Sequence, residues 1–363
     1  MRNHWILTKV FSCLLSTTCC LLPTVVTAQI TFERTYGGAV NDNGLSVQQT
    51  SDGGYIITGS TNSFGAGSSD VYLIKTNSSG DTLWTRTFGG TSDDGGYSVQ
   101  ETSVGGYVIA GFTYSFGAGS SDVYLIKTNA GGDTLWARTF GGTSNDWGTS
   151  VQETSDGGYI IAGSTYSFGA GFNDIYLIKT TSSGDTLWTR AFGGTSYEGG
   201  SSVQQTIPDG GYIIAGVTNS FGAGFYDAYL IKTNAGGDTL WTKTFGGTSD
   251  DDGYSVQETT DGGYILSGST YSFGEGMDDV YLIKTNAGGD TLWTKTFGGA
   301  SWETGSCLQQ TSDGGYIISG LTWSFGAGLG DAYLIKTNSG GDSLWTKTFG
   351  GTLDDYGYSV QQT

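Results

Sequence analysis

One short motif, Phe-Gly-Gly, returns at a near-constant interval along almost the whole chain and constrains the fold more than any other feature. It begins at Phe88, Phe140, Phe192, Phe245, Phe297 and Phe349, and Tyr36-Gly37-Gly38 is an earlier variant. The interval is 52 residues, except for 53 between Phe192 and Phe245, where the turn that contains Pro208 has one extra residue. A period of this size predicts a repeat architecture, so the fold can be inferred from a single unit.

The unit that follows Phe88 predicts four short strands joined by glycine-containing turns. The expected strands are 97–102, 107–111, 123–128 and 134–140. The first turn usually reads Ser-Asp-Gly-Gly, and Asp-Gly between β-prone runs is a strong hairpin signal because glycine accepts a positive φ. Four antiparallel strands in about 50 residues, with almost no helical pattern, predict one blade of an all-β propeller. A β-helix is the competing architecture, but its coils are usually shorter and lack two tight hairpins per turn.

The first 28 residues lie outside the repeat and have the pattern of a secretory signal peptide. A basic start and an apolar stretch precede the Val-Thr-Ala triplet that ends at Ala28, with Gln29 as the expected mature N-terminus. We therefore predict residues 1–28 as a signal peptide and residues 29–363 as the repeat domain. This assignment predicts a secreted or cell-surface protein whose mature chain does not span a membrane.

Composition excludes several kinds of chemistry. The only histidine, His4, and three of the four cysteines lie in the predicted signal peptide, so the mature chain has no residues for a histidine-dependent triad or a histidine-ligated zinc site. Cys307 stands where other repeats have serine, and we interpret it as a substitution of similar size in a strand rather than as a nucleophile. The formal net charge of −19 disfavours nucleic acid and anionic lipid as partners.

Four segments of the repeat resemble those of a known group of proteins. They read Phe-Gly-Gly, Gly-Tyr-Ile-Ile-Ala-Gly, Asp-Val-Tyr-Leu-Ile-Lys-Thr and Gly-Asp-Thr-Leu-Trp, at residues 88–90, 158–163, 122–128 and 132–136. The chain resembles secreted bacterial and archaeal β-propeller repeat proteins over essentially all of residues 30–363. The resemblance implies propeller blades, often followed by a C-terminal sorting domain that attaches the protein to the cell surface, and this sequence shows no such domain.

The repeat count predicts six complete blades and a partial seventh. Residues 30–36 align with a fourth strand, with Phe32 in the position of Trp84, and the sequence reaches Thr363 at the end of a first strand. We expect the N-terminal strand to close the seventh blade, whose two middle strands, roughly 25 residues by analogy with the other units, are missing. The sequence is therefore expected to be a fragment of a longer protein. A closed six-bladed ring with two surplus strands is the alternative.

Two sets of loop carboxylates recur in the repeat. One set follows the Phe-Gly-Gly motif and the other precedes the third strand, so both are expected on the same face of the propeller. Their first interpretation is that they accept backbone N–H groups and order the loops. Calcium binding is the alternative, although no Asp-x-Asp-x-Asp-Gly run supports it, and its candidate ligands are Asp94, Asp146, Asp251 and Asp355. Apart from calcium, no cofactor is predicted.

Residues that differ from the other repeats say more about function than residues that recur in every repeat. The basic residues occupy only two repeat positions, in the third and fourth strands, which indicates charge pairing and blade packing. Aromatic residues, by contrast, replace polar or smaller ones in the loops at Trp147, Trp302, Trp323, Tyr197 and Tyr226, with Phe172 and Phe225 in the same loop classes. Exposed aromatic residues beside carboxylates suit stacking on sugars or anchoring of a protein. Loop packing between adjacent blades is the alternative.

Together these patterns predict a non-enzymatic, secreted or surface-attached propeller that binds a protein or a polysaccharide through its looped face. A structural spacer or surface coat is a second interpretation. The alternative from another class is a carboxylate-based glycoside-active enzyme, or the targeting module of a longer enzyme. We expect the enzymatic alternative to be disfavoured, because no repeat shows a singular acidic pair that breaks the pattern.

Overall fold

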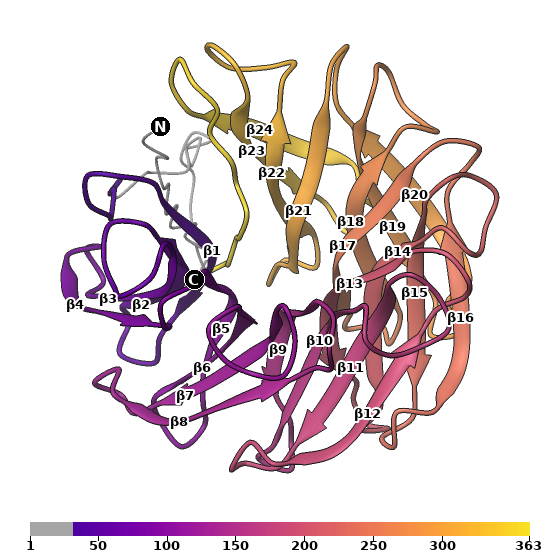
Figure 1. The fold of residues 1–363 in the computed structure, drawn as a ribbon. Coiled ribbons are helices and arrows are strands. Elements are labelled where there is room, and N and C mark those ends of the chain that lie inside the picture. Colours follow the sequence, from indigo (N-terminus) through magenta and orange to yellow (C-terminus); the bar gives the residue numbers. More distant parts are fainter. Residues whose placement is uncertain (1–31) are drawn as a thin grey trace, which may run out of the picture.

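The computed structural model describes residues 32–363, so the predicted signal peptide at residues 1–28 lies outside the described residues. Within residues 32–363 the chain forms six four-stranded antiparallel sheets around a central axis (Figure 1). Each sheet consists of four consecutive strands in sequence order, which is the architecture of a propeller blade. The prediction of an all-β propeller with four-stranded blades is confirmed. No helix in this range is long and apolar enough to cross a bilayer.

The strands have nearly the same length in every blade. Blades 1 to 3 contain β1 (Asp42–Gln49), β2 (Tyr55–Thr61), β3 (Asp70–Thr76), β4 (Thr82–Phe88), β5 (Asp94–Glu101), β6 (Tyr107–Thr113), β7 (Asp122–Thr128), β8 (Thr134–Phe140), β9 (Asp146–Glu153), β10 (Tyr159–Thr165), β11 (Asp174–Thr180) and β12 (Thr186–Phe192). Blades 4 to 6 contain β13 (Glu198–Gln205), β14 (Tyr212–Thr218), β15 (Asp227–Thr233), β16 (Thr239–Phe245), β17 (Asp251–Glu258), β18 (Tyr264–Thr270), β19 (Asp279–Thr285), β20 (Thr291–Phe297), β21 (Glu303–Gln310), β22 (Tyr316–Thr322), β23 (Asp331–Thr337) and β24 (Ser343–Phe349).

The innermost strand of each blade is longer than the sequence predicts. In blade 2 it begins at Asp94 rather than at Tyr97, because two glycines extend the pairing with β6 ahead of a bulge between Gly96 and Ser98. Glycine in β6 permits this close approach, since a Cβ built on Gly111 would overlap the carbonyl of Gly95. Glycine has a low strand propensity, so local sequence patterns do not predict these extra strand residues. Their pairing depends on the close approach of β5 and β6.

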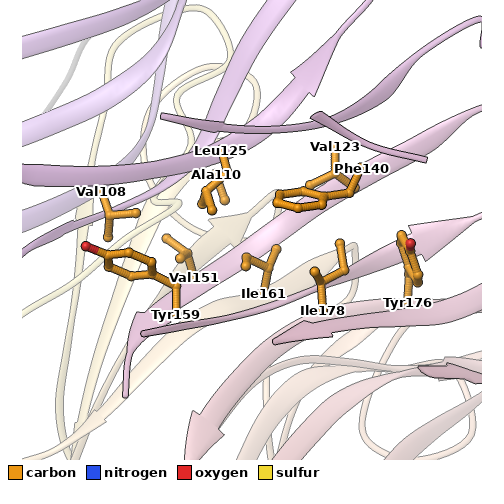
Figure 2. Packing of buried hydrophobic residues seen from close by; sticks show 10 residues of the cluster. All are labelled: Val108, Ala110, Val123, Leu125, Phe140, Val151, Tyr159, Ile161, Tyr176 and Ile178. Atoms are coloured by element: carbon orange, nitrogen blue, oxygen red, sulfur yellow. The ribbon is translucent and has the colours of Figure 1, made fainter. Parts of the chain in front are cut away.

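Adjacent blades enclose an apolar core between them. Between blades 2 and 3, side chains from β6 and β7 face side chains from β9, β10 and β11 (Figure 2). The residues of this core are Val108, Ala110, Val123, Leu125, Phe140, Val151, Tyr159, Ile161, Tyr176 and Ile178. The alternate residues Tyr107 and Ile109 point the other way, into the core shared with blade 1. Both faces of a blade are therefore buried, which explains why its middle strands are apolar without alternation.

Most basic residues among residues 32–363 pair with aspartates, which fits the charge pairing predicted from their repeat positions. In blade 1, Lys75 Nζ lies 2.8 Å from Asp52 in the β1–β2 turn. The cation of the fourth strand pairs with the following blade, where Arg86 Nη2 lies 3.2 Å from Asp133. Equivalent pairs are Lys179–Asp156, Lys232–Asp209, Lys284–Asp261, Lys336–Asp313, Arg34–Asp81, Arg138–Asp185, Arg190–Asp238, Lys243–Asp290 and Lys295–Asp342. The repeated charges stabilise blades and blade junctions.

A ring of glutamines lines the central channel. Gln48 Oε1 accepts a hydrogen bond of 2.6 Å from the backbone N–H of Glu101 in the next blade, and Gln100, Gln152, Gln204 and Gln257 repeat this bond. The channel has a volume of about 290 Å³ and is lined by these glutamines and by the valine or leucine beside each. Cys307 lies in this ring on β21, where burial raises the pKa of its thiol, so the substitution interpretation fits its position.

The predicted partial seventh blade is not formed as a sheet, and the structure has six blades. Residues 32–41 and 350–363 have no strand assignment, because neither segment forms a ladder of backbone hydrogen bonds with a strand among residues 32–363. The bond of 3.0 Å from the Gly357 N–H to the Gly320 carbonyl of β22 is not extended into a ladder. The C-terminal segment still continues the ring of glutamines. Gln309 Oε1 accepts the N–H of Gln362, and Gln361 Oε1 accepts the N–H of Gln49, both at 2.5 Å. The ring of these bonds thus passes from blade 6 through residues 358–363 to blade 1.

The N-terminal segment contacts blade 1 as a fourth strand contacts the following blade. The ring centroids of Phe32 and Tyr55 are 5.8 Å apart, and those of Trp84 and Tyr107 in the next junction are 5.9 Å apart. Tyr36 Oη donates a hydrogen bond of 2.7 Å to the carbonyl of Gly80. For the described residues 32–36, these contacts agree with the sequence alignment with a fourth strand, although no sheet forms.

Blade 2 offers a test of the ion pairs, since Val104 stands where the other first turns have aspartate. The buried Lys127 Nζ donates to the carbonyls of Gly105 and Thr128, both at 2.9 Å, and burial lowers its pKa. We predict that Val104→Asp stabilises the protein by about 1 kcal/mol, because it supplies a carboxylate to a buried cation. Guanidinium denaturation at pH 7 measures the change in the free energy of unfolding.

Val104→Asn is the matched control, because it has the same shape as aspartate without its charge. It is expected to give less than half of the gain. Equal gains from the two substitutions, or no gain from Val104→Asp, would contradict the ion-pair explanation.

Candidate functional site

Two classes of loops share one face of the propeller, which we call the looped face. One class joins the second and third strands of a blade, and the other joins a fourth strand to the first strand of the next blade. Single parallel bridges connect the two classes, between Ser69 and Asp93, Ser121 and Asn145, Asn173 and Tyr197, and Asp278 and Trp302. The prediction that both classes lie on one face is confirmed.

The repeated carboxylates of these loops are buried and bind backbone and hydroxyl donors. Asp94 Oδ2 accepts hydrogen bonds from the Gly90 N–H at 2.8 Å and from Ser115 Oγ at 2.7 Å. Asp146, Asp251 and Asp355 accept the equivalent bonds from the Gly142, Gly247 and Gly351 N–H groups. These contacts fit the first interpretation, in which the carboxylates order the loops. Within residues 32–363 no group of three or more acidic, cysteine or histidine side chains is arranged to hold a metal ion.

The Phe-Gly-Gly motif is explained by two carboxylates that flank its first glycine. A Cβ built on Gly89 would overlap both Asp70 Oδ1 and Asp94 Oδ2, and the first glycine of each later motif is flanked in the same way. Glycine is required because the backbone passes between two buried acidic side chains. In blade 5, burial and the nearby Glu303 carboxylate raise the pKa of Asp279 to about 6. The motif is a blade junction and not a ligand-binding loop.

The aromatic residues that break the repeat form three perpendicular pairs on the looped face. Trp147 contacts Tyr166 with ring centroids 5.7 Å apart, and Tyr197 contacts Tyr226 at 5.9 Å. The Trp302 and Trp323 rings lie 5.8 Å apart and remain 40% and 38% exposed. Each pair belongs to one blade, but Tyr197 and Trp302 also bridge to Asn173 and Asp278 of the preceding blades, so packing between adjacent blades contributes as well. We call these six residues the aromatic pairs.

Blades 3 to 6 present the three pairs next to one another. The electrostatic surroundings of Tyr197 include Tyr166 of blade 3, Tyr226 of its own blade and Asp252 of blade 5. Burial is the main cause that raises the pKa of Tyr197. On blade 5, Asp278 then bridges to Trp302 of blade 6. Aromatic and acidic side chains therefore alternate along one arc of the looped face. Phe172 and Phe225, in the adjoining loops, are 77% and 74% exposed.

A singular acidic cluster lies in this arc, on blade 5. Tyr254 Oη donates a hydrogen bond of 2.9 Å to Asp252 Oδ2, and Asp278 is only 8% exposed. Burial and the nearby Asp252 carboxylate raise the pKa of Asp278 to about 7. Among the described residues, Asp278 Oδ1 and Asp250 Oδ1 are buried without a hydrogen-bond partner, as are Asp94 Oδ1, Asp146 Oδ1 and Asp174 Oδ1 of the repeated sets. What is particular to blade 5 is the raised pKa of a buried carboxyl group beside a second carboxylate, which is typical of functional sites.

The expectation that no repeat has a singular acidic pair is wrong. Asp252 stands where the other blades have Asn43, Gly95, Trp147, Gly199 and Thr304, and Asp278 stands where they have Ser69, Ser121, Asn173, Tyr226 and Gly330. The run Asp250-Asp251-Asp252 was the signal in the sequence, but its last residue is 26 positions from Asp278. Only the blade geometry brings the two loops together.

Comparisons with known proteins support the fold. No protein-family profile matches the chain. The chain is 28% identical over 176 residues to the regulatory protein FlaEY of Caulobacter vibrioides, and the match covers 42% of this chain and 18% of FlaEY. The chain thus spans less than a fifth of that relative's length.

Two solved structures have the same overall arrangement. A protein from Lactobacillus plantarum matches with a TM-score of 0.51 and 12% identity, over 90% of this chain and 89% of that chain. Sqt1 from Chaetomium thermophilum matches with a TM-score of 0.51 and 11% identity, over 88% of this chain and 75% of that chain. At such low identity the similarity shows the repeat-rich β-propeller fold alone.

The acidic cluster predicts an unusual pH dependence of stability. Because the pKa of Asp278 is raised from 3.8 to about 7 in the folded state, its contribution is fully present below pH 3.8 and is lost as the pH rises through 7. We predict that Asp278→Asn stabilises the protein by about 2 kcal/mol at pH 8 and has little effect at pH 4. Denaturation at both pH values measures this difference.

The control is Asp93→Asn, which removes an exposed loop aspartate of blade 2 and is expected to change stability equally at pH 4 and pH 8. A pH-independent effect of Asp278→Asn would show that the Asp278 carboxyl group is not the titrating group.

The two interpretations of the repeated carboxylates predict different responses to calcium. Calcium that binds the folded state through Asp94, Asp146, Asp251 or Asp355 raises the melting temperature. One oxygen of each of these carboxylates already accepts N–H or O–H donors, and among residues 32–363 no group of three or more acidic, cysteine or histidine side chains is arranged to hold a metal, so we expect no shift. Thermal melting in 5 mM calcium and in EDTA, at about equal ionic strength, distinguishes the two. A rise of several degrees in calcium would favour the metal site.

Proposed function

We propose that this propeller is a non-enzymatic binding module, secreted or displayed at a cell surface, that binds a polysaccharide on the looped face of blades 3 to 6. The observation that supports it most directly is the arc of aromatic pairs interrupted by the acidic cluster. The repeat does not require these side chains, because other blades fold with small or polar residues at the same positions.

The chemistry of the arc suits sugars. Exposed indole and phenol rings offer flat apolar faces, and tryptophan Nε1–H and tyrosine O–H groups can bond to hydroxyls at the ring edge. The half-buried carboxylate of Asp252 can accept hydrogen bonds from hydroxyl groups or pair with amino groups. A chain with a net charge of −19 repels anionic polymers, so a neutral or amino-containing polysaccharide is the favoured class. A protein partner is the other outcome of a binding screen.

The Asp252–Asp278 pair supports a second candidate, a glycoside-active enzyme. A carboxylic acid with a raised pKa beside a second carboxylate is the arrangement that such enzymes use. Asp278 is 8% exposed, however, and its Oδ1 has no accessible surface, which disfavours contact with a glycosidic oxygen. Release of reducing ends from a bound polysaccharide, abolished by Asp278→Asn, would favour the enzyme.

We also propose that residues 32–36 and 358–363 occupy a seventh position in the ring. The glutamine bonds that pass through residues 358–363 and the Phe32–Tyr55 contact support this arrangement. Residues 358–363 take the place of an innermost strand, and residues 32–36 take the place of an outermost strand. The six sheets are then part of a ring with seven places.

The binding proposal is tested with the triple variant Trp147→Ala, Trp302→Ala and Trp323→Ala. A glycan array screened with residues 29–363 first identifies a bound polysaccharide, and titration calorimetry then measures its affinity. Loss of one aromatic contact costs about 1 kcal/mol, so the triple variant is expected to bind at least about 30-fold more weakly while still folding. Trp302 and Trp323 are exposed, whereas Trp147 is half-buried.

Tyr114→Ala is the matched control. Tyr114 occupies the repeat position of Tyr166 but lies on blade 2, outside the aromatic pairs, and is 43% exposed. Its removal is expected to leave the affinity within about twofold. Unchanged binding by the triple variant would reject the arc as the binding surface.

A further inference from the structure

An exposed apolar side chain stands at the same loop position in four successive blades. The position lies two residues before the aspartate that begins the third strand. Its occupants in blades 3 to 6, which we call the apolar tips, are Phe172, Phe225, Met277 and Leu329, and they are 77%, 74%, 53% and 48% exposed. Blades 1 and 2 have exposed serines there, Ser68 and Ser120. Two blades therefore have polar tips and four have apolar tips.

The loop forms with either kind of residue, because a bond that does not involve the tip side chain holds its backbone. In blade 1 the Ser68 carbonyl accepts a hydrogen bond from Asn62 Nδ2, and in blade 4 the Phe225 carbonyl accepts the equivalent bond from Asn219 Nδ2. Single exposed apolar residues are common on protein surfaces. Four of them at one repeat position, in blades that follow one another, are not required by the fold and indicate an interaction surface.

The repeated phenylalanine of the next blade connects one apolar tip to another. The Phe172 N–H donates a hydrogen bond of 3.1 Å to the Ser196 carbonyl, in the loop that leads into blade 4. On that same loop, a Cβ built on Gly194 would lie 3.2 Å from the Phe221 ring, which is 44% exposed. Phe221 and Phe225 belong to one loop, so apolar side chains continue from blade 3 to blade 4. The glycine and phenylalanine contact recurs onward at Gly247 and Phe273 and at Gly299 and Phe325.

The apolar tips differ in chemistry from the aromatic pairs. Phenylalanine and leucine side chains have no polar group, and the methionine thioether is only a weak acceptor. They therefore lack the N–H and O–H groups with which tryptophan and tyrosine bind sugar hydroxyls. Apolar side chains of a protein are the occupants that suit them best, and the unbranched Met277 can adapt its shape to such a partner.

The charges of the looped face select the partner further. The ion pairs of Lys75, Arg86 and their equivalents are made with aspartates of the tight turns, on the opposite face. In the loop of Met277, by contrast, Glu275 is exposed where the other five blades have alanine, and the half-buried Asp250 belongs to the same blade. Carboxylates beside apolar side chains attract lysine and arginine and speed the encounter with a partner that carries them.

Charge also argues against two other occupants. A second copy of this chain would bring two acidic looped faces together, and like charges that meet at an interface are unfavourable. An anionic lipid surface is repelled for the same reason, since the chain has a net charge of −19.

We propose that the apolar tips of blades 3 to 6 dock a protein partner whose binding segment carries large apolar side chains flanked by lysine or arginine. The apolar side chains of the partner contact the tips and the phenylalanines between them, and its cations face Glu275 and the neighbouring carboxylates. This inference does not rest on polysaccharide binding, because it involves neither the aromatic pairs nor a sugar.

The test selects peptides on residues 29–363 from a library of random 12-residue peptides displayed on phage. The enriched peptides are then synthesised, and titration calorimetry measures their affinity. We expect the enriched peptides to combine large apolar residues with lysine or arginine. Glu275→Gln is expected to weaken their binding about threefold at low salt and to have little effect in about 0.5 M sodium chloride, where exposed charges are screened.

The variant that tests the tips carries Phe172→Ser, Phe225→Ser, Met277→Ser and Leu329→Ser. It gives blades 3 to 6 the residue with which blades 1 and 2 already fold, so its melting temperature is expected to stay within about 2 °C of the parent. Its affinity for the selected peptides is expected to fall at least about tenfold.

The matched control removes four equally exposed apolar side chains from the outermost strands. It carries Leu83→Ser, Leu135→Ser, Leu187→Ser and Leu240→Ser, at positions that are 55% to 60% exposed. Its affinity for the peptides is expected to stay within about twofold of the parent, because these leucines lie outside the loops.

Four results would overturn the inference. They are the absence of enriched peptides, enriched peptides without basic residues, equal binding by the parent and the serine-tip variant, and an equal loss of affinity in the leucine control. Two more would assign the tips to another occupant and also overturn it. These are self-association at micromolar concentration, or binding to phosphatidylcholine vesicles, that the serine-tip variant loses.

Discussion

Every blade of this protein is apolar on both faces, and the ring depends on each face being covered by another sheet. Ile160 and Ile161 are neighbours in the sequence and both fully buried, one against blade 4 and one against blade 2. A single four-stranded sheet of this kind would leave the apolar side chains of both faces in water, so one repeat cannot fold alone. The stability of the protein therefore resides in the junctions between blades.

The two faces of the ring differ in how strictly their side chains repeat from blade to blade. On the face with the tight turns, the ion pairs of lysine and arginine recur with almost no variation, and they fasten turns and blades. On the looped face the repeated carboxylates are buried beside the glycines of the Phe-Gly-Gly motif, so they are part of the scaffold. The side chains above them vary from blade to blade. A repeated scaffold with variable loops allows a binding surface to change while every junction keeps its packing.

The acidic cluster on blade 5 is the clearest case in which local side chains lower the stability of the fold. Asp252 and Asp278 are crowded and largely buried, and burial and mutual repulsion raise the pKa of Asp278 to about 7. Other blades place neutral residues at the same two positions and form the same sheets, so the fold does not require the charges. A feature that costs stability and lies beside unusual aromatic residues is expected at a functional surface. Its position within the arc links the acidic and the aromatic departures to one site.

The sequence by itself determined the repeat, the four strands of each blade, the propeller class and the pairing of the basic residues. These follow from period, turn chemistry and repeated charge, which are local or strictly periodic signals. It also singled out Trp147, Tyr197, Tyr226, Trp302 and Trp323, because each breaks a repeat position. Only the tertiary structure decided that they pair within blades, that Asp252 meets Asp278, and that the terminal segments form no seventh sheet. The first two depend on distances between loops that are far apart in the sequence, and the third depends on the absence of a strand partner. A local sequence pattern encodes neither kind of information.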